Sequence, residues 1–159
     1  QRQRLNTTME IAWRFLSDPA NLNEITPDTL QFQILSGADH SMFEGQIISY
    51  RIRIAPLIWN TWVTEIKSVV PGRSFIDEQR AGPYRFWHHR HTLEPVKGGV
   101  EMADEVNYSI GFWLAGEAAH TVFVRRQLES IFSYRREALA QLFGEITPPS
   151  SDRSPVRSD

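Results

Sequence analysis

The chain lacks cysteine altogether, and this absence excludes three classes of site at once. Disulfide frameworks, thiolate zinc sites and cysteine nucleophiles all need the missing residue. Strong net charge is lacking too, because 17 basic residues nearly balance 19 acidic ones. Such a balance gives no long-range attraction to nucleic acid or anionic membranes, and we expect no nucleic-acid partner.

Long apolar runs and cofactor motifs are also absent. No segment approaches the roughly 20 apolar residues of a membrane span, and the opening Gln-Arg-Gln-Arg lacks the apolar centre of a signal peptide. Phosphate-binding glycine loops and the common hydrolase and zinc-protease motifs do not occur. We therefore expect a cytoplasmic protein with no membrane span, no metal and no other cofactor. The start at Gln1 suggests that residues precede it in the full protein.

Aromatic residues, in contrast, are plentiful, with nine Phe, five Trp and four Tyr among 159 residues. A chain of this length is expected to form one domain with one sizeable core, which we place at residues 1–146. The segment 147–159 has no large apolar residue except Val156. It cannot offset the entropy of ordering, so we expect a disordered tail there.

Helical signals occur near both ends of the chain. Thr7 and Glu10 have the spacing of a capping box and predict a helix that ends before Pro19. A second short helix is expected over residues 20–25. A long amphipathic helix is predicted over 120–143, with Gly144 as its cap. Its apolar stripe comprises Val124, Leu128, Ile131, Phe132, Leu139, Leu142 and Phe143.

Between these helices the apolar period changes to two, which is typical of half-buried strands. Strands are predicted at residues 1–6, from 31 onward, and at 47–54, 59–64, 75–79, 84–93 and 100–110. This order indicates an α+β domain. A curved antiparallel sheet wrapped around the last helix would bury the helix's apolar stripe and enclose a concave space.

Several separated motifs occur in an order that resembles one superfamily. They are Trp13-x-Phe15-Leu16-Ser17-Asp18-Pro19-x-Asn21-Leu22, Phe75-Ile76-Asp77-Glu78-Gln79, Gly82-Pro83-Tyr84, Trp87-x-His89-x-His91, Asp104-Glu105-Val106-x-Tyr108 and Phe123-Val124-Arg125-Arg126-Gln127-Leu128. The pattern resembles the bacterial SRPBCC ligand-binding proteins of the START, polyketide cyclase and birch-pollen-allergen superfamily.

The resemblance implies a helix-grip fold. In that fold a curved antiparallel sheet of about seven strands, with two short helices after the first, grips a long C-terminal helix and leaves a hydrophobic cavity between them. Relatives include lipid carriers, cyclases and hormone receptors, so the fold alone does not determine the activity. Some relatives are fused to, or encoded beside, a reductase domain that resembles nucleotide-sugar epimerases.

Residues 84–93 hold three of the five histidines. Strand alternation puts His89 and His91 on one face. If Gly98-Gly99 forms a two-residue turn, His91 lies opposite Val106 and diagonal to Asp104. The face that includes Val106 is apolar enough to be the concave one, so His89, His91 and Asp104 are expected to point inward.

This polar group allows three interpretations. Two imidazoles and a carboxylate could bind zinc or iron, although no further ligand is marked. His91 oriented by Asp104 could instead be an acid/base pair for an enolisable substrate. In the third interpretation, which we weigh most heavily, His89, His91, Asp104 and Tyr108 satisfy one another's hydrogen bonds and hold the polar end of a ligand. We assign no catalytic residue; His91 and Asp104 are the candidates.

A second polar stretch closes the strand at 75–79. If Phe75 faces inward, Asp77 and Gln79 do so too and add to the polar lining. The alternative is that Asp77 pairs with an arginine such as Arg85.

Two further features precede or belong to the last helix. Arg135 lies near the apolar stripe, from which it could reach a carboxylate such as Asp104 or Asp77. The apolar segment 111–116 is either a lid over the cavity mouth or a plain connection whose side chains pack or dimerise.

The leading hypothesis is a carrier or sensor that binds an apolar, aromatic or lipid-like small molecule between the sheet and the last helix. The first alternative is a polyketide cyclase- or dehydratase-like enzyme, and the second is a regulatory or partner module of a reductase- or epimerase-like protein. A homodimer is a further partner hypothesis. The expected ligand-binding residues are Ile52, Trp59, Phe75, Asp77, Gln79, Trp87, His89, His91, Asp104, Val106, Tyr108 and Leu128.

Overall fold

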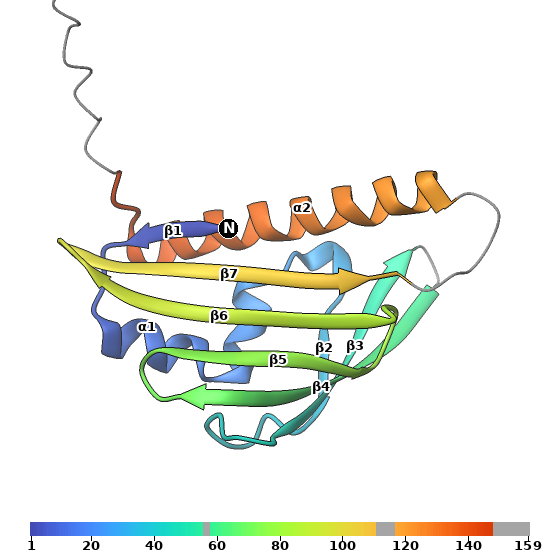
Figure 1. The fold of residues 1–159 in the computed structure, drawn as a ribbon, viewed down its shortest axis with the longest axis horizontal. Coiled ribbons are helices and arrows are strands. Elements are labelled where there is room, and N and C mark those ends of the chain that lie inside the picture. Colours follow the sequence, from blue (N-terminus) through green and yellow to red (C-terminus); the bar gives the residue numbers. More distant parts are fainter. Residues whose placement is uncertain (56–57, 111–116, 148–159) are drawn as a thin grey trace, which may run out of the picture.

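The computed structural model describes residues 1–55, 58–110 and 117–147, in which seven strands form one antiparallel sheet of order β1-β7-β6-β5-β4-β3-β2 (Figure 1). The strands are β1 (Arg2–Leu5), β2 (Gln33–Ser36), β3 (Ile47–Ala55), β4 (Ile58–Val70), β5 (Ser74–Ala81), β6 (Phe86–Val96) and β7 (Gly99–Ser109). The helices are α1 (Met9–Leu16), the 3₁₀ helices η1 (Pro19–Ile25) and η2 (Asp28–Leu30), and α2 (Glu117–Phe143). This arrangement confirms the predicted α+β helix-grip fold. The predicted lid at 111–116 and all but the first residue of the predicted tail lie outside the described residues.

The two main helices are capped by side-chain and backbone chemistry that the sequence largely predicts. The N-cap of α1 is Thr8 rather than Thr7, and its hydroxyl accepts a hydrogen bond from the amide of Ile11 at 3.2 Å. The capping-box spacing to Glu10 selects Thr7, and this expectation is wrong by one residue, because the residue three positions after the true N-cap is Ile11. At the end of α2, Gly144 has a φ of 76° and donates its amide to the carbonyl of Ala140 at 2.9 Å, as predicted.

The β6–β7 hairpin is shifted by two residues from the predicted register. Val96 pairs with Gly99, so Lys97 and Gly98 form the turn in place of Gly98 and Gly99. Gly98 has a left-handed φ of 87°, whereas Gly99 lies in the strand, where a side chain would collide with the carbonyl oxygen of Leu5. A shift of two leaves every side chain on its predicted face.

The observed register brings two carboxylates beside two histidines. Asp104 lies directly opposite His91 instead of diagonal to it, and Val106 is opposite His89. On the other side of β6, Asp77 of β5 is opposite His89. The three adjacent strands β5, β6 and β7 therefore place Asp77, His89, His91 and Asp104 on one face of the sheet.

One end of the concave face is a packed core that joins β1, β7 and α2. Its fully buried side chains include Leu5, Val100, Met102 and Leu139. Ala12 of α1 and Ile25 of η1 belong to the same cluster, so α1, η1 and α2 all pack on this side of the sheet. This core holds α2 against one end of the sheet and leaves the rest of the concave face to the cavity described below.

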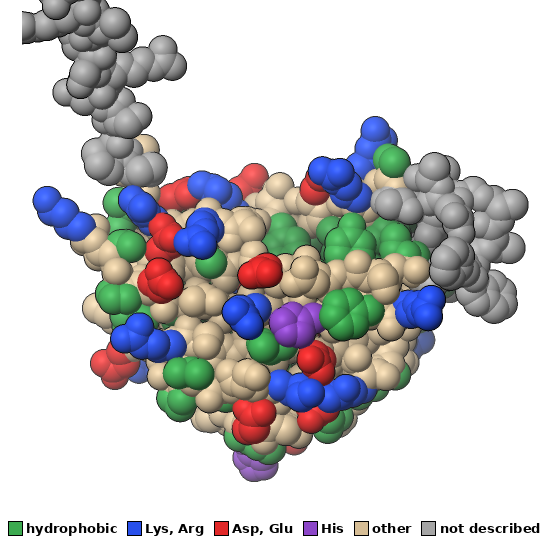
Figure 2. Space-filling view, in the orientation of Figure 1, with side chains coloured by type: hydrophobic (Ala, Val, Ile, Leu, Met, Phe, Trp, Pro, Cys, Tyr) green, Lys and Arg blue, Asp and Glu red, His purple; other side chains and the backbone are tan. Residues whose placement is uncertain are grey.

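The outer surface is mixed in character. Figure 2 shows basic and acidic side chains interspersed with apolar ones over the face in view. Within the described part of the chain, none of the helices has the length and apolar character of a membrane span.

Candidate functional site

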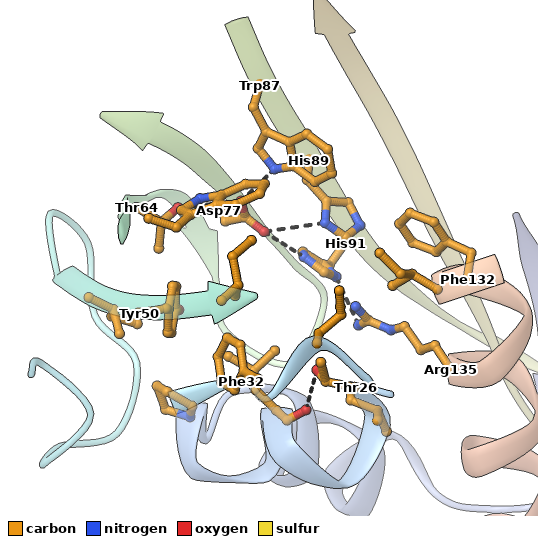
Figure 3. Close-up of a pocket in the computed structure, with 18 of the residues that line it drawn as sticks. Thr26, Phe32, Tyr50, Thr64, Asp77, Trp87, His89, His91, Phe132 and Arg135 are labelled. Atoms are coloured by element: carbon orange, nitrogen blue, oxygen red, sulfur yellow. Dashed lines mark hydrogen bonds and ion pairs between the residues drawn. The ribbon is translucent and has the colours of Figure 1, made fainter. Parts of the chain in front are cut away.

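A cavity of about 370 Å³ lies between the sheet, η1 and α2 (Figure 3). This volume is in the range of roughly 300–1,000 Å³ that small-molecule sites occupy. Most of its wall is apolar and includes Leu22, Ile25, Phe32, Ile48, Ile52, Ile66, Phe75, Leu128, Ile131 and Phe132. Charged and polar side chains gather at the part formed by β4, β5, β6 and α2, which includes Thr64, Asp77, His89, His91 and Arg135.

The structure brings together seven of the twelve side chains that the sequence places in a ligand site. They come from β3, β5, β6 and α2, and each faces the cavity because strand alternation or the helical stripe turns it inward. These seven are Ile52, Phe75, Asp77, Trp87, His89, His91 and Leu128.

Three of the remaining five lie on the same face but behind the lining. Asp104 is only 8% exposed and lies against the two histidines. Val106 and Tyr108 pack on a cluster that contains Trp87 and Leu128. These three residues support the wall.

Trp59 and Gln79 contradict the expectation that they line the cavity. Trp59 lies on the outer face of β4, where the guanidinium carbon of Arg51 is 4.4 Å from its ring centroid. Trp62, three positions later and of opposite parity, faces the cavity instead. The side chain of Gln79 donates to the carbonyl of Tyr84 at 2.6 Å and accepts from its amide at 3.3 Å, so it closes the β5–β6 loop.

Asp77 is the centre of the polar wall. Its Oδ1 accepts hydrogen bonds from Trp87 Nε1 at 2.9 Å and from the Thr64 hydroxyl at 3.3 Å. Its Oδ2 lies 3.2 Å from His89 Nδ1 and 3.4 Å from His91 Nε2. Figure 3 shows these side chains pointing toward one another from neighbouring strands.

A second carboxylate, Asp104, lies on the other side of both imidazoles. Its Oδ1 is 2.9 Å from His89 Nε2 and 2.9 Å from His91 Nδ1. Arg135 of α2 reaches this group, with Nη2 3.7 Å from Asp104 Oδ1 and 3.4 Å from His91 Nδ1. The arginine that reaches this cluster is therefore Arg135, next to the apolar stripe of α2, and not Arg85, which was the alternative expectation for Asp77.

Burial and neighbouring charges act in opposite directions on these groups. Burial alone would raise the pKa of Asp77, but hydrogen bonds with His89 and His91 hold it well below its ordinary value. Burial would also raise the pKa of Asp104, but Arg135 and the two histidines hold this pKa well below its usual range. Burial would lower the pKa of His89, but hydrogen bonds to Asp104 and Asp77 raise it. Both carboxylates are therefore ionised at neutral pH.

The lowered pKa of Asp104 predicts a specific sensitivity to acid. The groups that face this carboxylate are His89, His91 and Arg135, and the folded-state pKa lies below the unfolded value of about 3.9. Its stabilising contribution is therefore complete above about pH 5 and is lost as the pH falls toward the folded value. Between about pH 5 and 2, we expect the free energy of unfolding of Asp104→Asn to fall less steeply than that of the wild type. Urea denaturation with a chelator in the buffer measures both slopes, and equal slopes would contradict the assignment.

The sequence interpretation missed the inward residues of β4. Tyr50 pairs with Trp62 and Ile48 pairs with Thr64, which puts all four side chains in the cavity wall. Proline favours turns, and in a hairpin centred on Pro56 the residues at equal distances before and after it would pair. Tyr50 would then pair with Trp62 and Ile48 with Thr64, so the sequence contained a signal for this register.

Comparison with known proteins finds no matching family model and no matching curated protein. Solved structures do match. Protein CV1439 from Chromobacterium violaceum aligns with 91% of this chain and 95% of its own, with a TM-score of 0.69 and 16% identity. A START superfamily protein from Mycobacterium smegmatis aligns with 89% of this chain and 96% of its own, with a TM-score of 0.62 and 11% identity.

A third likeness is to part of a larger protein. The nucleoside-diphosphate sugar epimerase from Corynebacterium glutamicum matches 88% of this chain but 28% of its own length, with a TM-score of 0.62 and 15% identity. At identities this low, the structural likenesses show a shared fold but not a shared activity. The activity has to be inferred from the site residues of this chain. The sheet order, the terminal helix and these likenesses together show that the chain has a helix-grip α+β fold, like that of the START superfamily protein.

Proposed function

We propose that the protein binds a small, mostly apolar ligand with one polar end in this cavity, as a carrier or sensor. The observation that carries the proposal is the composition of the cavity wall, which is mostly apolar and has a cluster of charged side chains on β5, β6 and α2. An aromatic or lipid-like body would be stabilised against the apolar side by about 25 cal/mol for each Å² removed from water.

Arg135 supports a polar end on the ligand. It lines the cavity, is 8% exposed, and its Nε has no hydrogen-bond partner among the described residues. A buried donor without a partner is costly, so an oxygen of the ligand placed there would gain a hydrogen bond and remove that cost. Native mass spectrometry of protein purified without detergent would give the mass of a co-purified ligand and so name its class.

A cavity-filling variant tests this proposal directly. Ile52→Trp adds an indole ring to the wall, and we expect it to weaken binding of an apolar fluorescent dye at least about tenfold, equivalent to 1.4 kcal/mol. Ile47→Trp is the matched control, because Ile47 lies on the outer face of the same strand and is 48% exposed. Its dye affinity should stay within about twofold of the wild type. Unchanged dye affinity in a folded Ile52→Trp protein would overturn the cavity as the binding site.

The enzyme alternative has weaker support in the geometry. His91 and Asp104 are in contact, as a base and its orienting carboxylate would be, but both nitrogens of His91 already face carboxylates. A free nitrogen aimed at substrate is what general-base chemistry needs. If the protein is a cyclase or dehydratase, His91→Ala should abolish turnover while ligand affinity survives; equal loss of both favours the carrier or sensor.

A second candidate function is supported by the epimerase comparison. Because this fold forms one part of a chain that carries an epimerase name, we propose as the alternative that this chain is a partner module of a reductase- or epimerase-like protein. Co-elution of the two purified proteins in size-exclusion chromatography would support this alternative, and separate elution at micromolar concentrations would count against it.

A further inference from the structure

The polar wall brings three potential metal ligands together on adjacent strands. His89 and His91 project from the same face of β6, and Asp77 of β5 is the cross-strand partner of His89. One ligand atom from each of the three lies within 4.8 Å of the others. Asp77 Oδ2 faces His89 Nδ1 and His91 Nε2. We propose that these three side chains bind one divalent transition-metal ion, of the Zn²⁺ or Fe²⁺ type, at the wall of the cavity.

The distances from the Asp77 oxygen to the two imidazole nitrogens fit such an ion. Bonds of about 2.0–2.2 Å at angles between octahedral and tetrahedral put neighbouring ligand atoms about 2.8–3.6 Å apart. The Asp77 oxygen is 3.2 Å from one imidazole nitrogen and 3.4 Å from the other. Two imidazoles and one carboxylate form a donor set that zinc and iron favour, and it leaves further positions open to water or a ligand.

The surrounding hydrogen bonds orient the three ligands. Asp104 Oδ1 lies 2.9 Å from the second nitrogen of each imidazole, so it can accept a hydrogen bond from both rings. A bound ion would take the place of the protons between Asp77 Oδ2 and the two rings, with His89 Nδ1 and His91 Nε2 then free to coordinate it. The other Asp77 oxygen is held by Trp87 Nε1 at 2.9 Å. A carboxylate behind each metal-binding histidine is the usual outer-shell arrangement of such sites.

Charge and access are consistent with this assignment. Asp77 and Asp104 supply two negative charges and Arg135 one positive charge, so a divalent ion would leave the cluster with a single net positive charge if both imidazoles are neutral. The Asp77 side chain keeps 22% of its area accessible, and Asp77, His89 and His91 all line the cavity. The open positions of the metal therefore face the space that the proposed ligand would fill. The metal site does not depend on the proposed ligand, because an ion could bind in an empty cavity.

Titration of chelator-treated full-length protein with Zn²⁺ or Co²⁺ alone tests the site. We expect one tightly bound ion per chain by calorimetry and a visible Co²⁺ absorption band. Asp77→Asn and His91→Gln should each weaken binding by more than about 100-fold, since loss of a ligand should exceed the 10–100-fold effect of an outer-shell partner. Asp104→Asn should weaken it by about 10–100-fold. His88→Gln, on the opposite face of β6, is the matched control and should bind like the wild type.

Imidazole NMR of the wild type avoids any dependence on folded variants. Adding Zn²⁺ should shift the ring nitrogen signals of His89 and His91 and leave those of His40 and His88 in place. Absence of a one-to-one complex, or equal binding by the Asp77→Asn and His88→Gln proteins, would overturn the metal site. The contacts of Asp77 with His89 and His91 would then be ordinary hydrogen bonds. Dye binding separates the two proposals. If the wild-type protein binds the apolar dye but no metal ion, the metal site alone is refuted.

Discussion

Replacing Asp104 by asparagine is expected to lower the free energy of unfolding by about 3–5 kcal/mol. Asp104 is 8% exposed, lies against both histidines and is 3.7 Å from the guanidinium of Arg135. The asparagine side chain keeps the volume but not the charge, so it leaves the buried Arg135 without its counter-ion. Urea denaturation followed by far-ultraviolet circular dichroism at neutral pH measures the loss.

Two further variants make this result specific. Glu105→Gln changes the neighbouring, exposed carboxylate on the other face of β7 and should stay within about 0.5 kcal/mol of the wild type. The double variant Asp104→Asn, Arg135→Met removes both charges and should recover part of the loss, which the double-mutant cycle reports as a coupling energy. A loss below about 1 kcal/mol for Asp104→Asn, or no recovery in the double variant, would contradict the buried ion pair.

The second large effect is expected at the core that joins α2 to the sheet. Leu139→Ala should destabilise the protein by about 2–5 kcal/mol, because it leaves a hole among Leu5, Val100 and Met102. Leu139 is 2% exposed. This residue lies outside the cavity lining, so the folded variant should bind the apolar dye with wild-type affinity.

The matched control lies on the same helix. The sequence pattern puts Leu142 on the same apolar stripe, but the structure leaves it 47% exposed. Leu142→Ala should therefore cost less than about 1 kcal/mol. Similar losses for both leucines would mean that α2 packs on the sheet by a different face from the one described.

The elements themselves could be predicted because each depends on local chemistry. The helix over 120–143 shows its period of three to four without interruption, and Gly144 ends it where the sequence predicts. Along β6 the alternation of side chains correctly puts His89 and His91 on the concave face, since which face a residue occupies depends only on its parity along the strand.

Register and face were harder to predict where local chemistry is ambiguous. Two consecutive glycines, Gly98-Gly99, do not show which of them must bend the chain, and the answer depends on the distant strand β1. Trp59 and Trp62 are both large and aromatic, so the apolar pattern of β4 gives no contrast between its faces. The contacts of Trp59 with Arg51 and of Trp62 with Trp87 are made only in the folded sheet.

The pairing of Asp77 with His89 can be predicted from the position of a turn in the sequence. Strand alternation predicts that Asp77 faces inward, but alternation alone does not pair Asp77 with His89. In a hairpin centred on Pro83, within the predicted Gly82-Pro83 turn, residues at equal distances before and after Pro83 pair. Asp77 then pairs with His89, as it does in the structure. A turn centred on a single proline therefore indicates which side chains meet in this chain, whereas the glycine pair Gly98-Gly99 does not.

The carboxylates and histidines of the cavity wall come from other strands than much of its apolar lining. The carboxylates and histidines project from β5, β6 and β7, which are held together by their own backbone ladders. The size and shape of the remaining space depend on η1, β3, β4 and α2. Substitutions at Leu22 or Ile52 would thus alter the volume of the cavity while leaving the carboxylates and histidines in place, whereas a shift of α2 would change the volume and also move Arg135.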